Sequence, residues 1–457
     1  MNNSYKLFTS TPPVRLFFIA AIPGAVSMLA SSLYGLLDGV FVGRILGETS
    51  FAAINLAFPF VVINFSLADL IGVGSAVPIS IALGKKEHAQ ANNIFTCACL
   101  MIVGTGFAIG AVLYVSAPAL LSLLGAEGEL AALAVQYMRV YAICSPVTTI
   151  VFAMDNYLRI CGQIRPSMWL NIFMSALTAV LEFTFLYVFH WGIWGAALAT
   201  CTGMLVCALI AFYPFARGRF QLHLCRPHFT LPMVRQILAC GVPNFLNNIA
   251  GRITSIVMNM ALIRLGGESA VSVYGVLMYA GEIVQPMLYG VCDSLQPAVG
   301  YNWGARKYNR VKAIEKCCFA AGAVISISLS LCALVFPAQI VGLFIGTEDT
   351  ALIEMGAFAM RLFSLTYLTR WFSFATQSYM TAVEKPFPAS VISVSTALIF
   401  PVLLLAVLWP LGLTGIWLNS TISAVLAAVL AAVILIRFQQ DLRRRIHKES
   451  TAPVNPD

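Results

Sequence analysis

The sequence predicts an all-α polytopic membrane protein, with twelve transmembrane helices in two six-helix bundles related by a pseudo-two-fold axis along the membrane normal. Three observations predict this fold class. The chain is 60% hydrophobic and only 10% charged, with a mean hydropathy of +0.86, whereas soluble domains carry about 25% charged residues. Its apolar residues form twelve runs, each long enough to cross a bilayer, which takes roughly 20 residues. The second half of the chain also repeats features of the first half.

Polar residues, glycines and prolines separate the apolar runs and set the predicted ends of the spans. In chain order the spans are predicted at residues 16–43, 51–83, 94–121, 131–157, 166–189, 192–215, 236–264, 270–303, 313–345, 351–383, 386–409 and 412–438. The polar segment before Val14, followed by so long an apolar run, does not resemble a cleavable signal peptide. We therefore expect the first span to act as the targeting signal.

The distribution of lysine and arginine predicts the orientation in the membrane. Twelve spans place both termini on one side, and all but six of the 27 basic residues fall in the tails and loops of that side. Because basic loops stay in the cytoplasm, both termini are predicted to be cytoplasmic. The expected location of the protein is the plasma membrane, as a bacterial inner-membrane protein. The net charge of +8 then reflects loops that face lipid headgroups, so the bilayer is the expected partner and nucleic acid is not.

The two halves match in order, with an offset of about 220 residues, which indicates a duplicated unit. Matching pairs include Pro23 and Pro243, Met138-Arg139 and Met360-Arg361, Pro166 and Pro388, and Gly192 and Gly412. Each unit holds six spans, so the units share one orientation about an axis along the membrane normal. We predict an N-terminal lobe at 1–216, a cytoplasmic connection at 217–235, a C-terminal lobe at 236–440 and a cytoplasmic tail at 441–457.

A lone carboxylate in the first span, Asp38, is the strongest candidate for a functional residue, because a charge at bilayer depth is unfavourable unless it is used or paired. Glu182 and Thr178 lie one helical turn apart in the fifth span, and Thr200 lies in the sixth. Together with Asp38 they would make an all-oxygen cluster. Asp38 and Glu182 could hold a hard cation such as Na⁺ or exchange a proton instead, and the alternative is a purely structural pairing between helices.

In the C-terminal half Glu282 is the best candidate for a substrate-binding carboxylate, and Arg252 and Arg370 could instead neutralise it in a buried ion pair. Aromatic and methionine side chains favour adaptable binding of flat lipophilic ligands; the candidates for lining such a pocket are Tyr34, Met154, Tyr279 and Met287. Motifs of the common hydrolases, nucleotide-binding proteins and zinc proteases are missing. We therefore expect no enzyme activity and no cofactor, and an ion gradient as the energy source.

Three segments carry a resemblance to a known family. Residues 38–43 read DGVFVG, residues 158–162 read LRICG, and residues 295–306 read LQPAVGYNWGAR. The chain resembles the multidrug and toxic compound extrusion (MATE) family over about residues 14–440. The resemblance implies twelve spans in two lobes and export of organic cations or other xenobiotics in exchange for Na⁺ or H⁺.

In the Na⁺-coupled members of that family, the cation site consists of a first-span Asp, a fifth-span Asn and Asp one turn apart, and a sixth-span Thr. The resemblance places these roles on Asp38, Thr178, Glu182 and Thr200. The chain departs from the pattern at two positions, with Thr for Asn and Glu for Asp. Both replacements keep an oxygen ligand, and the choice between Na⁺ and H⁺ stays open.

The leading functional hypothesis is therefore a secondary active antiporter that exports cationic or amphipathic drugs by alternating access, and that works as a monomer. The alternative is a flippase for lipid-linked saccharides, built on a related two-lobe architecture. Its pyrophosphate cargo would favour a cavity lined by arginine, for which Arg252 and Arg370 are candidates, whereas Asp38, Glu182 and Glu282 argue against it. A receptor or scaffold would leave the full-length repeat without a role.

Overall fold

A computed structural model describes residues 3–124, 126–343 and 350–451, without the side chains of residues 3, 36, 48, 268, 282, 283 and 445–451. Within these ranges the regular secondary structure is all helical, with no strand. In the N-terminal half the helices are α1 (Asn3–Ser10), α2 (Pro13–Ile45), α3 (Glu48–Gly84), α4 (His88–Leu123), α5 (Gly128–Thr148), α6 (Ile150–Ile160), α7 (Ile164–Phe183), the π-helical turn η1 (Thr184–Val188) and α8 (Ile193–Ala216).

The C-terminal half follows the non-helical segment 217–230. Its helices are α9 (Leu231–Ser294), α10 (Gln296–Gly304), α11 (Tyr308–Val335), α12 (Pro337–Gly342), α13 (Thr350–Ser364), α14 (Tyr367–Ala382), α15 (Pro386–Val394), the π-helical turn η2 (Ser395–Ile399), α16 (Phe400–Leu408), the short 3₁₀ turn η3 (Trp409–Leu411) and α17 (Gly412–Thr451).

Among the described residues, ten helices are long and apolar enough to cross a membrane, and the bent pair α13 and α14 adds an eleventh if it is one span. One of the ten, residues 386–444, holds two spans. Asn419 in α17 donates a hydrogen bond of 2.8 Å to the carbonyl oxygen of Pro401 in α16, although residues 18 apart in a straight helix are about 27 Å apart. The chain therefore reverses between them, and the predicted count of twelve spans is confirmed.

Glycine turns and π-helical turns recur in the two halves at matching positions. Gly192 and Gly412, paired by the sequence repeat, have φ values of +69° and +60°. Gly47 and Gly267 end the first and the seventh span with φ values of +87° and +65°. These angles lie in the region that favours glycine, so the sequence places glycine where both halves need the same turn. The turns η1 and η2 likewise interrupt the fifth and the eleventh span.

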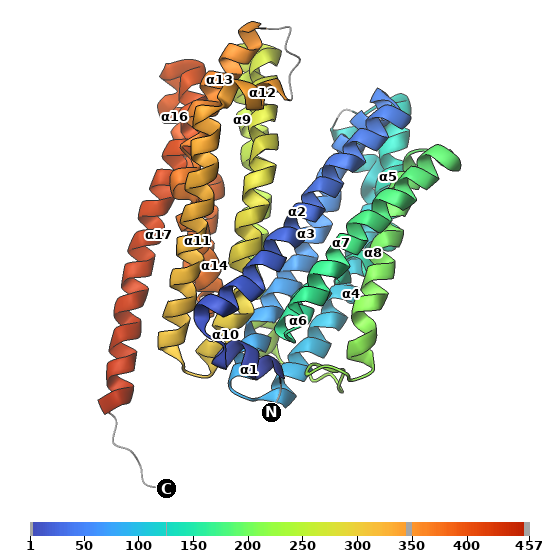
Figure 1. Cartoon of the computed structure of the whole chain (residues 1–457). Coiled ribbons are helices and arrows are strands. Elements are labelled where there is room, and N and C mark those ends of the chain that lie inside the picture. The colour runs from blue at the N-terminus through green and yellow to red at the C-terminus, as the bar shows by residue number, and fades with distance from the viewer. Residues whose placement is uncertain (1–2, 125, 344–349, 452–457) are drawn as a thin grey trace.

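The helices form two lobes, α2–α8 and α9–α17, whose ribbons meet at one end and diverge toward the other (Figure 1). The end where they meet, formed by α1 and the turns at 84–88 and 304–308, is here called the base. At the base, glycines allow backbones to touch. A Cβ atom on Gly241 would lie 1.8 Å from the carbonyl oxygen of Leu70, and one on Gly304 would lie 2.2 Å from that of Ile81.

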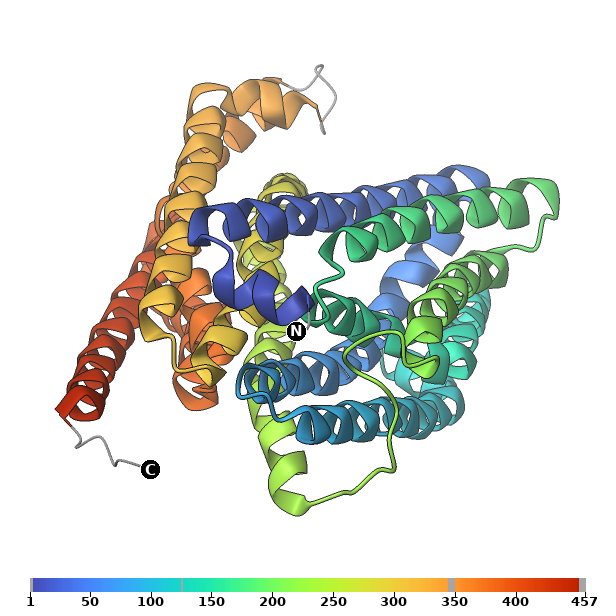
Figure 2. The same ribbon diagram turned by 60° about the horizontal axis from the view of Figure 1, so that its bottom comes forward.

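Helix α1 lies between the two lobes at the base (Figure 2). Ser4 donates a hydrogen bond of 2.6 Å to the carbonyl oxygen of Cys161 in the N-terminal lobe. From the C-terminal lobe, Asn302 donates to the carbonyl oxygen of Phe8 (2.9 Å), and Arg310 donates to that of Thr11 (2.6 Å). The N-terminal segment thus ties both lobes together at their closest approach.

Candidate functional site

Four polar side chains from three helices meet inside the N-terminal lobe. Tyr34 and Asp38 lie one turn apart on α2, Glu182 lies near the end of α7, and Thr200 lies on α8. The Tyr34 hydroxyl oxygen is 2.8 Å from Thr200 Oγ1 and 3.5 Å from Glu182 Oε2. Asp38 lies close enough to Glu182 and Tyr34 to interact with both. The structure therefore brings together three of the four predicted cation-site residues and Tyr34, which the sequence suggested as a substrate contact.

We call Tyr34, Asp38, Glu182 and Thr200 the N-lobe cluster, and among the described side chains no cation balances it. The Glu182 side chain is fully buried, and its Oε1 atom has no hydrogen-bond partner. Within the described part of the chain the single ion pair is elsewhere, between Asp155 and Arg159. Two adjacent carboxyl groups in a low-dielectric site are unfavourable when both are charged. Such a pair fits either one bound proton or one cation held by oxygen ligands.

Thr178, the fourth predicted member, lies beside the cluster but its hydroxyl hydrogen is already used. It shares a face of α7 with Glu182 and donates a hydrogen bond of 2.7 Å to the carbonyl oxygen of Met174 in its own helix. A Cβ atom on Gly203 would lie 2.3 Å from its Oγ1 atom. Thr178 therefore packs α7 against α8, and only its oxygen lone pairs face any further ligand.

Two tyrosines of α5 complete the surroundings and were missed by sequence reasoning. The Tyr141 side chain lies near Thr200 and Asp38, and the Tyr137 ring is 5.1 Å from that of Tyr141. Both side chains are buried. The signal was available, because two tyrosines one turn apart in an apolar helix share a face, but the sequence does not show that this face turns toward α2 and α8.

A second buried polar network lies near the base. Arg159 of α6 forms an ion pair with Asp155 at 2.6 Å, and Asn171 of α7 donates to the same carboxylate at 2.8 Å. Across the lobes, Arg159 donates to the hydroxyl of Ser294 at 3.2 Å. The neighbouring Asp293 of the C-terminal lobe accepts a hydrogen bond from Ser378. Unlike the N-lobe cluster, this network has its own cation and joins the two lobes.

The other predicted residues are scattered. Met154 is fully buried in the core, so it offers no surface to a substrate in this arrangement. Tyr279 is half exposed on α9. Met287 is half-buried and lies about two turns further along the same helix. The Glu282 side chain is outside the described residues. Arg252 is exposed, and neither it nor Arg370 forms an ion pair with any described carboxylate.

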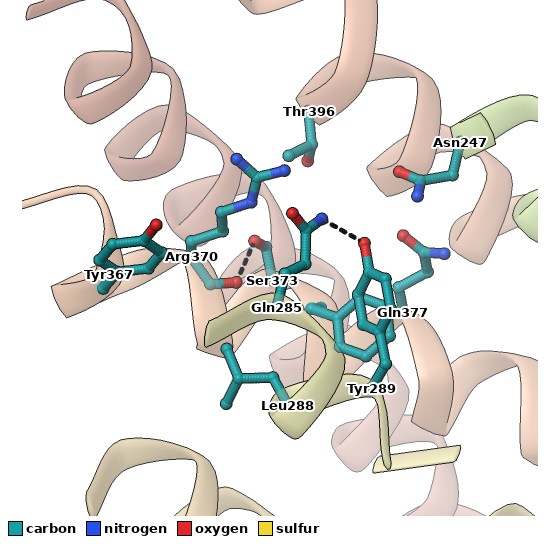
Figure 3. A pocket seen from close by; sticks show the side chains of 10 residues that line it. Asn247, Gln285, Leu288, Tyr289, Tyr367, Arg370, Ser373, Gln377 and Thr396 are labelled. Carbon is teal, nitrogen blue, oxygen red and sulfur yellow. Dashed lines mark hydrogen bonds between the residues drawn. The ribbon is translucent and has the colours of Figure 1, made fainter. Parts of the chain in front are cut away.

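A pocket in the C-terminal lobe surrounds one of the predicted residues, Arg370 (Figure 3). The enclosed part of this C-lobe pocket is small, about 30 Å³, and the surrounding space amounts to about 470 Å³ when the open solvent at its mouth is counted. It is lined by Asn247, Gln285, Leu288, Tyr289, Tyr367, Arg370, Ser373, Phe374, Gln377 and Thr396. Of these, the sequence pointed only to Arg370, because neutral amides and hydroxyls in apolar helices give no distinctive signal.

Comparison with known proteins agrees with this architecture. The family model MatE matches residues 23–184 and again residues 243–407, once in each half of the chain. The chain is 26% identical over 440 residues to the multidrug export protein MepA of Staphylococcus aureus, covering 95% of this chain and 96% of that protein. It is 24% identical to MepA of Staphylococcus saprophyticus, covering 92% and 93% of the two chains.

Solved structures share the fold. A multidrug resistance MATE family transporter of the MOP superfamily in an outward-facing conformation matches with a TM-score of 0.91 and 22% identity, covering 97% of this chain and 99% of that one. A MATE structure in complex with MaL6 matches with a TM-score of 0.90 and 21% identity, covering 96% and 100%. With a family model matching both halves and the two-lobe fold described above, the chain belongs to the multidrug and toxic compound extrusion (MATE) family of membrane transporters.

Proposed function

We propose that this protein is a secondary active antiporter that exports cationic or amphipathic drugs and other toxic organic compounds in exchange for Na⁺ or H⁺. The observation that carries the proposal is the N-lobe cluster, in which Asp38 approaches the buried Glu182 and no described cationic side chain lies beside them. Its oxygens could bind and release one small cation. The names of the relatives, multidrug export proteins, support drugs as the cargo.

The arrangement of the lobes supports alternating access. The lobes touch at the base through backbone contacts at glycines and through α1, and they diverge away from it (Figure 1). Opening at the base while closing at the other end would expose the interior to the opposite side. A cation bound to Asp38 and Glu182 would favour one arrangement and bound drug the other, which is the differential binding that coupling requires.

We further propose a monomer in a bacterial inner membrane with both termini cytoplasmic, and the division into lobes at 1–216 and 236–440, a connection at 217–235 and a tail at 441–457. The first and last described helices, α1 and α17, end on the same side of the molecule (Figure 1), which supports the shared location of the termini. The exposed arginines of the connection, Arg217, Arg219 and Arg226, support a cytoplasmic base.

The test is transport in liposomes. Purified protein is reconstituted, and movement of a cationic dye is followed under an imposed Na⁺ gradient and, separately, under a pH gradient. We expect one gradient to drive the dye, which names the coupling ion. Asp38→Asn and Glu182→Gln should abolish this transport, since each removes a charge that the coupling cation needs.

Glu87→Gln is the matched control, because Glu87 lies exposed in a turn of the base and its change should leave transport intact. Gradient-driven transport that survives in both Asp38→Asn and Glu182→Gln would overturn the role of the N-lobe cluster. Absence of dye movement under either gradient would instead favour the flippase alternative, for which flipping of a lipid-linked saccharide is the assay.

A further inference from the structure

Arg370 occupies a position in the C-terminal lobe where an unbalanced charge is unfavourable. The helices α13 and α14 together make one span that bends by 44° at a short break. Arg370 lies in the first turn after that break, well inside the apolar segment 350–382. Charged side chains at such depth usually pair or mark a binding site. The described carboxylates include no ion-pair partner for Arg370.

The lining of the C-lobe pocket offers hydrogen bonds but no described negative charge. The Arg370 guanidinium points toward Thr396, with Asn247 and Gln377 across the hollow (Figure 3). The Thr396 Oγ1 atom is buried and makes no hydrogen bond. It lies in the π-helical turn η2, a distortion that is frequent at functional sites. Guanidinium, amide and hydroxyl groups that converge in this way suit an acceptor with several oxygens.

The repeat shows that the two lobes differ in charge at equivalent positions. Between Arg139 and Arg361, and between Pro166 and Pro388, the halves align with a constant offset of about 222 residues. Asp155 of the N-terminal lobe therefore corresponds to Gln377 in the C-lobe pocket. Thr148, likewise, corresponds to Arg370. The same offset pairs Arg159 with Thr381, so the ion pair of Asp155 and Arg159 has two neutral counterparts in the C-terminal lobe. Arg370, in contrast, is a cation where the N-terminal lobe has the hydroxyl of Thr148, so the C-terminal lobe carries an additional positive charge at this position.

One wall of the pocket is apolar and aromatic. Leu288, Tyr289 and Phe374 form it, and the rings of Tyr289 and Phe374 lie 4.2 Å apart. Gln285 donates a hydrogen bond to the Tyr289 hydroxyl, which holds this ring in place (Figure 3). Ligand pockets commonly combine such a surface with a few placed polar groups. An amphiphile could lay its ring system on this wall with an anionic group at Arg370.

We propose that the C-lobe pocket binds the anionic group, a carboxylate or a phosphate-type oxyanion, of an amphiphilic ligand through Arg370, Thr396 and Gln377. For transport this inference rests on the proposed export function, and it assigns the negative group of a zwitterionic cargo to this pocket. The N-lobe cluster would take the positive charge of the coupling ion, while the C-lobe pocket would take the negative group of the cargo. Binding itself is independent of transport and is tested directly.

The experiment uses two dyes that differ in the negative charge at issue and otherwise only by an ethyl group. Rhodamine B carries a free carboxylate, and its ethyl ester does not. Both are titrated by fluorescence anisotropy against the purified full-length protein in nanodiscs of phosphatidylcholine. We expect Arg370→Gln to weaken binding of the acid by about tenfold or more, the effect of losing a charge-assisted hydrogen bond. The ester should change by less than about twofold.

Controls separate a lost contact from a lost fold. The ester titration shows whether Arg370→Gln still folds, and Arg370→Lys should keep part of the acid binding since it keeps the charge without the planar fork. Arg252→Gln removes an exposed arginine of the same lobe and should change neither dye. Equal loss of acid and ester in Arg370→Gln, or unchanged binding of the acid, would overturn the proposal.

The anionic group could belong to a lipid as well as to a free amphiphile. Titrations are therefore repeated with half of the phosphatidylcholine replaced by phosphatidylglycerol. If a lipid headgroup fills the site, the anionic lipid should weaken binding of the acid to the wild-type protein but not to Arg370→Gln. Unchanged affinity identifies the free amphiphile as the source. If Asp38→Asn transported normally while Arg370 still selected the acid, the coupling proposal alone would fail.

Discussion

Asp155 and Arg159 lie one turn apart on α6 and carry the ion pair of the network near the base. Burial makes such a pair weak as a source of net stability, but it makes the loss of one partner expensive, because the other charge remains without compensation. The two residues differ in this respect from Asp38 and Glu182, whose missing cation must come from outside. A buried carboxylate with its own cation, such as Asp155, therefore indicates a structural role. A buried carboxylate without one, such as Glu182, indicates a site for an external cation.

We expect Arg159→Met to lower the free energy of unfolding by about 3–5 kcal/mol, because it leaves Asp155 charged and buried beside Asn171. Thermal unfolding of the purified protein in detergent measures the change. Arg165→Met is the control, since Arg165 is exposed on the adjacent helix and its replacement should move the midpoint by little. Equal midpoints for the two variants would show that the ion pair contributes no more than a surface arginine.

Residue types found most of the N-lobe cluster but not its geometry. Asp38 and Glu182 stand out in apolar helices because a carboxylate there is costly, so a single sequence is enough to select them. Tyr137 and Tyr141 do not stand out, since tyrosine is common at membrane interfaces and in packed cores. Their place near Asp38 depends on the rotation of α5 about its axis, which no local pattern in the chain specifies.

At the scale of elements, the helices near the base are held by close backbone packing. Gly241 of α9 and Leu70 of α3 approach so closely that an added methyl group has no room. Gly251, ten residues further along the same helix, has nothing within 4 Å of the position of a Cβ atom. The two glycines make a matched pair, because both lie in a helix and only one lies in the contact between α3 and α9.

We expect Gly241→Ala to destabilise the protein by about 1–3 kcal/mol, since the methyl group forces α3 and α9 apart. In contrast, Gly251→Ala should be neutral or stabilising by up to about 1 kcal/mol, the gain in helix propensity. Thermal unfolding measures both, and hydrogen exchange of α1 should rise only in Gly241→Ala. A destabilised Gly251→Ala with an unaffected Gly241→Ala would contradict the packing at the base.

The ends of the helices could be predicted from local residue types more often than the bends within them. The turn glycines Gly192 and Gly412 were visible in the sequence, and their positive φ angles explain why glycine stands there. The bend between α13 and α14 and the π-helical turns were not predicted. Part of the cause at η2 is local, because Pro401 has no N–H for the carbonyl oxygen of Ala397, which accepts a hydrogen bond from Thr254 instead. The bend and η1 depend on how neighbouring helices satisfy backbone groups at those points.

At the scale of the whole molecule, the two lobes are each continuous along the chain and are joined by the segment 217–230. Side chains of α4 hold the backbone of this segment in place. The backbone N–H of His223 donates to Asn92 Oδ1 at 3.0 Å, and that of His228 donates to Asn93 Oδ1 at 2.8 Å. Its arginines are nevertheless exposed, so the connection reports the orientation of the base.

We expect trypsin to cut after Arg217 or Arg219 in inside-out membrane vesicles and to leave right-side-out vesicles uncut at these sites. The reason is that basic segments remain on the cytoplasmic side. Mass spectrometry of the fragments identifies the cut. Cleavage of the connection only in right-side-out vesicles would place the base, and with it both termini, on the outer face.

The number of spans, the duplication and the selection of Asp38 and Glu182 follow from residue type and order alone. They depend on the free energy of placing apolar and charged groups in a bilayer. The folded structure was needed to show that Asp38, Glu182 and Thr200 meet at Tyr34, that Thr178 is used in packing, and that Arg370 faces a pocket rather than a described carboxylate. Rotation of helices about their axes sets these contacts, and it follows from the packing of many side chains at once.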